Sequence, residues 1–128
     1  MEAFRALRVQ RYGLVVPYIE PVARRISENL GKEGYECVAL EHDELTTNWE
    51  FANIGGDAIA DRVRRAAAAR PDAIAIHCTN MRGAEVAESL ERELDVPVID
   101  SVAVGLWGAL SMLGVQAPVE FGRLASIG

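Results

Sequence analysis

Residues 73–80 read Ala-Ile-Ala-Ile-His-Cys-Thr-Asn, an apolar run that ends in polar side chains. A short apolar run of this kind, closed by polar residues, predicts a buried strand. A helical pattern precedes the run and is stopped by Pro71, and a second helical pattern follows it. The apolar positions of these two helices are Ile59, Val63, Ala66 and Ala67 before the run, and Val86, Leu90 and Leu94 after it. The centre of the chain therefore predicts a helix, a buried strand and another helix.

The same alternation continues in both directions from this centre. Further strands are predicted within residues 8–16, 37–40 and 96–99, which are rich in Val, Leu and Ile. A helix is expected from Pro21, because proline is well tolerated in the first helical turn. Its apolar stripe is predicted at Val22, Ile26 and Leu30, with four-residue spacing. Ser101 is expected to cap a last helix that runs to about Leu113.

Strands that alternate with helices predict a parallel sheet covered by helices. Right-handed crossovers make a doubly wound, flavodoxin-like sheet of four parallel strands the expected topology. The length of 128 residues suits a single α/β domain over residues 1–128. A longer polar connection over residues 41–56 stands out, because long loops in compact domains are often functional.

The last predicted helix, residues 101–113, is apolar nearly all round. A small four-stranded sheet has little room to cover such a helix. One interpretation packs it on the sheet and the tail of the chain, and the other turns part of it toward another subunit or a missing half.

Charge and composition exclude several classes of function. The chain holds 13 Lys and Arg against 19 Asp and Glu, which gives a net charge of −6. An acidic chain without a basic run argues against nucleic-acid and membrane-surface binding. Residues 1–5 lack the apolar core of a secretory signal, and two cysteines form no disulfide framework. We expect a cytoplasmic protein with free thiols.

Candidate chemistry lies where the strands end, because parallel sheets bind ligands beyond the carboxyl ends of their strands. Cys78 ends the third predicted strand, and free N–H groups or a helix N-terminus near it would stabilise a thiolate. The same N–H groups can hold a carboxylate or an oxyanion. Thr79 and Asn80 add short polar side chains suited to capping or ligand contact. Tyr18 follows the first strand, and its hydroxyl is suited to a substrate carboxylate. Asn48 lies in the long polar connection.

Each of these residues also has a purely structural interpretation. Cys78 equally fits a small buried apolar residue, Tyr18 fits a residue of the sheet rim, and Asn48 fits a turn residue. His77 is expected to point away from Cys78, because side chains alternate along a strand. The cysteines and histidines have no metal-ligand spacing, and no glycine-rich nucleotide motif is present, so no metal or cofactor is expected.

An ordered set of motifs resembles the C-terminal half of the Asp/Glu racemase superfamily, in the branch of maleate cis-trans isomerase and arylmalonate decarboxylase. These motifs are Tyr12-Gly13-Leu14-Val15-Val16-Pro17-Tyr18, Asn48-Trp49-Glu50, Ala75-Ile76-His77-Cys78-Thr79-Asn80-Met81-Arg82, Leu90-Glu91, Pro97-Val98-Ile99-Asp100-Ser101, Trp107-Gly108-Ala109-Leu110 and Gly122-Arg123-Leu124. They cover nearly the whole chain in the family's order, with Tyr18, Asn48 and Cys78 each thirty residues apart.

The resemblance implies a cofactor-independent enzyme that acts on the carbon next to a carboxylate of a small dicarboxylate. In that family two pseudo-symmetric α/β halves enclose the active site, and Cys78 matches the acid/base cysteine of the C-terminal half. Tyr18 matches a tyrosine that binds a substrate carboxylate, Asn48 matches an asparagine that contacts substrate, and the N–H groups of Thr79 and Asn80 complete the carboxylate site. Isomerisation, racemisation and decarboxylation stay open at this point.

The motifs cover one half of the family fold, and residues 3–7 resemble the helix that ends the first half. The resemblance therefore implies a partner, either a second copy in a homodimer or a missing N-terminal half. A non-catalytic flavodoxin-like domain that acts in binding or assembly is the alternative, because a fold alone does not determine a function.

Overall fold

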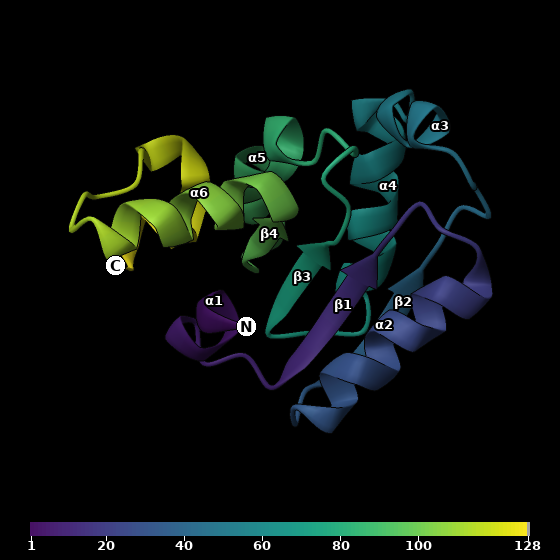
Figure 1. The fold of residues 1–128 in the computed structure, drawn as a ribbon, viewed down its shortest axis with the longest axis horizontal. Coiled ribbons are helices and arrows are strands. Elements are labelled where there is room, and N and C mark those ends of the chain that lie inside the picture. Colours follow the sequence, from purple (N-terminus) through teal and green to yellow (C-terminus); the bar gives the residue numbers. More distant parts are fainter. Residues whose placement is uncertain (128) are drawn as a thin grey trace.

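The computed structural model describes residues 1–127 and contains a four-stranded, all-parallel sheet in the order β2-β1-β3-β4. The strands are β1 (Arg11–Val15), β2 (Glu36–Glu41), β3 (Ala73–Ile76) and β4 (Val98–Asp100). The helices are α1 (Glu2–Ala6), α2 (Glu20–Lys32), α3 (Asn48–Ala52), α4 (Gly56–Ala67), α5 (Ala84–Leu94) and α6 (Ser101–Met112), followed by a 3₁₀ segment, η1 (Val119–Ser126). The predicted doubly wound parallel sheet is confirmed (Figure 1).

Two apolar cores lie on the two faces of the sheet. On one face, α4 and α5 pack on Val15, Ile74 and Ile76, and all three side chains are fully buried. On the other face, α1, α2 and α6 cover Leu14 and Ala75. Alternate strand residues therefore serve opposite cores, as the pleat of a strand requires. Within residues 1–127, every helix is too short or too polar to span a bilayer.

The buried stripe of α2 differs from the prediction. Val22 is 42% exposed, and the fully buried residue of this helix is Ala23. Ala23, Ile26 and Leu30 are spaced by three and four residues, which follows the 3.6-residue turn of a helix better than two steps of four. The apolar face therefore begins with Ala23 instead of Val22, whereas Ile26 and Leu30 lie on it as predicted.

The long polar connection contains a short helix, α3, that the apolar pattern did not predict. Thr47 and Glu50 form a capping box at its start: the Glu50 carboxylate accepts from the Thr47 N–H at 3.0 Å, and the Thr47 hydroxyl accepts from the Glu50 N–H at 3.3 Å. Such a pair satisfies N–H groups that the first helical turn leaves free. The connection therefore holds α3 in a defined place beside the sheet.

The prediction that Ser101 caps α6 is wrong, because the cap is Asp100. The Asp100 carboxylate accepts from the N–H groups of Val102 and Ala103 at 2.8 and 3.0 Å. Ser101 is the first helical residue, and its hydroxyl instead donates to the carbonyl of Ile76 at 3.1 Å. Burial raises the pKa of Asp100, and the N–H groups that it accepts from oppose this rise.

The cap can be tested by substitution. Asp100→Ala is expected to lower the free energy of unfolding by about 1–2 kcal/mol, because both N–H groups lose their acceptor. Ser101→Ala is expected to cost less, since the Ile76 carbonyl keeps its place in the sheet. Urea denaturation of both variants measures the difference, and equal losses would contradict the assignment of Asp100 as the cap.

Candidate functional site

The candidate site lies at the carboxyl ends of β1 and β3, which are neighbouring strands. After β1 the chain turns to α2 on one face of the sheet, and after β3 it turns to α5 on the other face. Loops that leave adjacent parallel strands in opposite directions open the crevice where ligands bind in doubly wound sheets. Tyr18 follows β1 and Cys78 follows β3, so both sequence-predicted residues border this crevice.

The backbone fixes both residues close to the paired part of the sheet. Val15 and Ile76 are register partners, and the N–H of His77 donates to the carbonyl of Val15 at 2.9 Å. Tyr18 is tied to the loop after β2, because its carbonyl accepts from the Glu44 N–H at 3.2 Å. The two side chains therefore extend from a rigid framework.

Tyr18 lies next to Cys78, and the two side chains influence each other. Burial, and to a smaller degree the adjacent Cys78 side chain, raises the pKa of Tyr18 to about 12. At neutral pH the phenol is therefore a neutral hydrogen-bond donor. The edge of its ring meets Phe51 of α3, with ring centroids 5.2 Å apart and planes at 85°.

The raised pKa of Tyr18 predicts that its phenol loses its proton only at high pH. The difference in ultraviolet absorbance between the wild type and Tyr18→Phe is expected to rise near pH 12, while far-UV circular dichroism shows that the chain stays folded. In a second pair of variants that both carry Cys78→Ser, the midpoint is expected to move down, since part of the shift comes from Cys78. A midpoint near the ordinary value of 10 in the wild type would contradict this placement.

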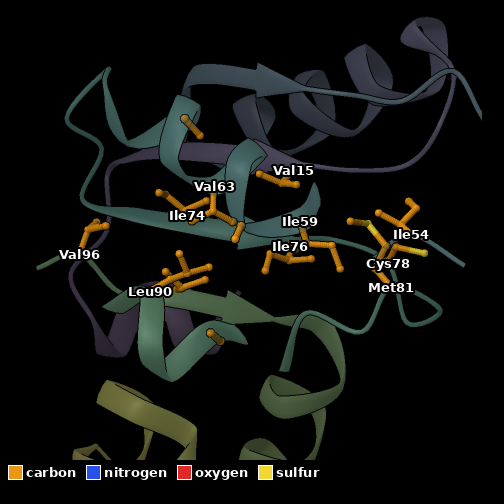
Figure 2. Close-up of a cluster of buried hydrophobic side chains, with 14 of the residues drawn as sticks. Val15, Ile54, Ile59, Val63, Ile74, Ile76, Cys78, Met81, Leu90 and Val96 are labelled. Atoms are coloured by element: carbon orange, nitrogen blue, oxygen red, sulfur yellow. The ribbon is translucent and has the colours of Figure 1, made fainter. Parts of the chain in front are cut away.

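The Cys78 side chain is 5% exposed and belongs to the apolar core on the α4 and α5 face. Figure 2 shows Cys78 at one end of that cluster, together with Ile54 and Met81. The sequence placed Cys78 close to a helix start, but α5 begins only at Ala84. The nearest free N–H groups belong instead to the turn that follows Cys78.

That turn presents the two residues predicted to complete a carboxylate site. Thr79 is exposed and Asn80 is half-buried, and the turn is closed by the Met81 N–H, which donates to the carbonyl of Cys78 at 3.3 Å. Within the described chain, the N–H groups of Thr79 and Asn80 donate to no backbone carbonyl. Adjacent unpaired N–H groups of this kind can accept an anion.

Asn48 is less closely tied to the other candidates. It is exposed on the first turn of α3, the helix whose Phe51 packs on Tyr18. His77 lines a cavity formed by residues of α1, α6 and the sheet on the face opposite Cys78. The predicted opposite orientation of His77 is confirmed, although its side chain is exposed rather than packed.

Glu20, His42 and Glu44 are the residues of the described chain whose side-chain atoms lie closest to a metal-ligand arrangement, all within 4.8 Å of one another. Sequence spacing did not reveal them, because they come from α2 and from the loop after β2. Part of the cluster is already engaged: Arg24 pairs with Glu20 at 2.5 Å, and Glu44 Oε1 accepts from the Glu20 N–H at 2.9 Å. His42 Nδ1 lies 2.7 Å from the same Glu44 oxygen but makes no hydrogen bond within the described chain.

Comparison with known proteins gives a consistent set of matches. Residues 1–125 match the family model described as arylmalonate decarboxylase. The maleate isomerase of Nocardia farcinica is 31% identical over 126 residues, which are 97% of this chain and 50% of that protein. The arylmalonate decarboxylase of Bordetella bronchiseptica is 29% identical over 128 residues, covering 97% of this chain and 53% of that protein.

A solved structure of a mutant of the Nocardia farcinica maleate cis-trans isomerase, with a covalently bound succinylcysteine intermediate, is similar to this fold. Its TM-score is 0.90 at 31% identity, and the match covers 97% of this chain and 51% of that one. The chain therefore spans about half the length of the curated relatives that it matches.

Proposed function

The chain belongs to the arylmalonate decarboxylase family, and from this premise we propose that it supplies one half of a cofactor-independent active site for small dicarboxylates. The sequence motifs resemble the branch that includes maleate isomerase, and this resemblance is confirmed. In this proposal Cys78 is the acid/base group and reacts at the carbon next to a carboxylate. The juxtaposition of the Tyr18 hydroxyl and the Cys78 thiol at the β1–β3 crevice is the observation that carries the proposal.

The proposed site combines groups that bind the substrate with one group that reacts with it. The Tyr18 hydroxyl, neutral at pH 7, donates to one substrate carboxylate together with the N–H groups of Thr79 and Asn80. Asn48 contacts the substrate from α3. Held in this way, the substrate presents its α-carbon to the sulfur of Cys78.

The reaction at the α-carbon can take either of two courses. In a decarboxylation, CO₂ leaves without the electron pair of the broken bond, and the Cys78 thiol protonates the resulting enediolate. In an isomerisation, a thiolate supplied by the opposite half adds to one carbon of the double bond and the Cys78 thiol protonates the other carbon. The new single bond rotates, Cys78 takes the proton back, and the adding thiolate leaves. The succinylcysteine of the maleate isomerase forms in a cysteine-to-serine mutant, so the covalent bond in that protein is made by a cysteine other than the replaced one. This supports an isomerisation in which the adding thiolate is not that of Cys78.

A second half is needed to close the site. Four cavities of residues 1–127 lie elsewhere on the molecule, and neither Tyr18 nor Cys78 lines any of them. The chain spans about half the length of its curated relatives, so the other half of the family fold can supply the opposite wall. We infer that the opposite wall comes from a second copy of the chain or from an N-terminal half of the family fold.

Protection from alkylation tests the proposed site. In a Cys37→Ser background, Cys78 is the single thiol. Iodoacetamide is expected to modify it in the native state, and malonate is expected to slow the reaction by occupying the carboxylate site. Tyr18→Phe should weaken this protection, since the hydroxyl donor is lost.

The alternative function is a non-catalytic domain for binding or assembly, and the 5% exposure of Cys78 favours it. A thiol that reacts only when the chain is unfolded would support this alternative. So would alkylation at a rate that malonate does not change. Either result would contradict the proposed active site.

A further inference from the structure

Asp100, at the end of β4, has a carboxylate oxygen that the cap of α6 does not use. The side chain is 1% exposed, and Oδ1 is the oxygen that accepts from the first turn of α6. The other oxygen, Oδ2, is also buried and has no hydrogen-bond partner within residues 1–127. Because an unpaired buried carboxylate oxygen costs free energy, such atoms are rare and are found where a fold has a functional constraint.

Oδ2 faces the start of α5, the helix that follows Cys78. A Cβ at Gly83 would lie 2.7 Å from Oδ2 and 2.9 Å from side-chain carbons of Ile76, so a larger residue there would press on both. Gly83 offers α5 no side-chain cap. Burial raises the pKa of Asp100, and the N–H of Ala84, the first residue of α5, is among the groups that oppose the rise. The carboxylate therefore places negative charge at the starts of both α5 and α6.

The neighbouring Ser101 contacts the other end of the same connection. Its hydroxyl donates to the carbonyl of Ile76, the last residue of β3, at 3.1 Å. Asp100 is also the register partner of Ile76. Asp100 and Ser101 thus contact the segment 77–83 at both ends, where it leaves the sheet and where it enters α5. This segment carries the proposed reacting thiol and the N–H groups proposed to bind a carboxylate.

The contacts of Asp100 are complete within this chain. Asp100, Ile76 and Gly83 are all buried by other residues of the described part. The arrangement therefore does not depend on what forms the opposite wall of the site.

We propose that Asp100 is a positioning residue, whose two carboxylate oxygens fix the starts of α5 and α6 and thereby hold the segment that carries Cys78. The importance of this position rests on the proposed function, because a displacement of about 1 Å in a reacting group can reduce a rate on the order of 10²-fold. Whether Asp100 holds the segment can be measured without any reaction.

Two substitutions disturb the contact with α5 and keep a cap on α6. Asp100→Asn retains one oxygen for α6 but replaces the other with an amide donor, and Asp100→Ser retains a capping oxygen and leaves the place of Oδ2 empty. Asn and Ser are both favourable helix caps. Asp72→Asn is the matched control, because Asp72 also accepts from two backbone N–H groups, those of Gln10 and Arg11, at the opposite end of the sheet.

Hydrogen exchange of single amides, followed by nuclear magnetic resonance, tests the positioning directly. Two amides report on the segment: the Met81 N–H, which donates to the Cys78 carbonyl at 3.3 Å, and the Ala87 N–H, which donates to the Gly83 carbonyl at 3.0 Å. In both Asp100 variants these two amides are expected to exchange about tenfold faster, since one contact with a charged group is lost.

The Ile59 N–H is the reference amide, because it donates to the Gly55 carbonyl at 3.1 Å in the first turn of α4. Its exchange rate is expected to stay unchanged, since the loss is local to the segment. Asp72→Asn is expected to leave all three amides at their wild-type rates. Unchanged exchange at the two segment amides in both Asp100 variants, or an equal acceleration at Ile59, would overturn the proposal.

Malonate binding tests the consequence for the site. In the Cys37→Ser background, the malonate concentration that halves the alkylation rate of Cys78 is expected to rise about tenfold in Asp100→Asn and to stay unchanged in Asp72→Asn. A loss of stability alone changes the folded fraction but not this concentration. An unchanged concentration in Asp100→Asn would show that Asp100 does not position the site. If malonate fails to protect even the wild-type thiol, the proposed function fails, whereas the exchange rates still decide whether Asp100 holds the segment.

Discussion

Replacing Cys78 with alanine is expected to lower turnover of the assembled enzyme by about 10²- to 10⁴-fold, the usual contribution of a positioned acid/base group. The sulfur is the group in the proposed site that can deliver a proton to the substrate carbon or take it up, and alanine can do neither. Release of CO₂ from phenylmalonate, conversion of maleate to fumarate, and racemisation of a chiral amino dicarboxylate are measured for the wild type and the variant. The reaction that responds identifies the chemistry.

Cys37→Ala is the matched control for this experiment. Cys37 lies half-buried in β2, and its thiol donates to the carbonyl of Ala39 at 3.3 Å, away from the β1–β3 crevice. Its replacement is expected to leave turnover within about two-fold, since surface and strand substitutions outside a site act mainly on stability. Equal turnover of Cys78→Ala and the wild type would remove Cys78 from the reaction.

Glu91→Ala is expected to lower the free energy of unfolding by about 2–4 kcal/mol, because it leaves two buried N–H groups without an acceptor. The Glu91 carboxylate is 6% exposed and accepts from the Val98 N–H at 2.9 Å and from the Arg123 N–H at 2.8 Å. It therefore joins α5 to the start of β4 and to η1. Gly122 makes room for it, since a Cβ there would overlap a carboxylate oxygen of Glu91.

Denaturation by urea measures this loss, with Glu85→Ala as the control on an exposed turn of α5. Glu85 forms a 3.9 Å ion pair with Arg82, and its replacement is expected to cost less than about 1 kcal/mol. Comparable losses for the two variants would show that the Glu91 contacts contribute little to stability.

The stability contributed by Glu91 also depends on pH in a defined direction. Burial raises the pKa of Glu91, although the Val98 and Arg123 N–H groups oppose the rise. Between its ordinary value and the raised value, the folded chain holds a proton that the unfolded chain has released. The contribution of Glu91 to the free energy of unfolding is therefore fully present at low pH and is lost as the pH rises through this window. Glu91→Gln cannot titrate and is expected to remove this part of the pH dependence.

The sheet could be predicted from the sequence because its strands are short apolar runs between clear helical patterns. Residues 73–76 are the clearest example, since this apolar run coincides with β3. The sequence pattern did not show which of two neighbouring residues caps α6. Asp100 rather than Ser101 caps α6, because the position of the first helical turn depends on where β4 ends in the sheet.

The site was predictable only in part. The topology of a parallel sheet places Tyr18 and Cys78 at one edge, and this follows from the order of strands and helices. The depth of Cys78 in the apolar core depends on how α3 and α4 pack, and no pattern in residues 77–81 reveals it. Glu91 lies in one of the quoted motifs, yet its role in holding η1 follows only from contacts across 32 positions of sequence.

Tyr18 and Cys78 are sixty positions apart in the chain, and each extends from its own connection at a shared edge of the sheet. In the proposed site, a change in the connection after β3 can alter the proposed reacting group without moving the phenol, and a change after β1 can alter the proposed anchoring group without moving the sulfur. Natural variation can therefore retune substrate preference and chemistry one at a time, while the strands beneath remain the same.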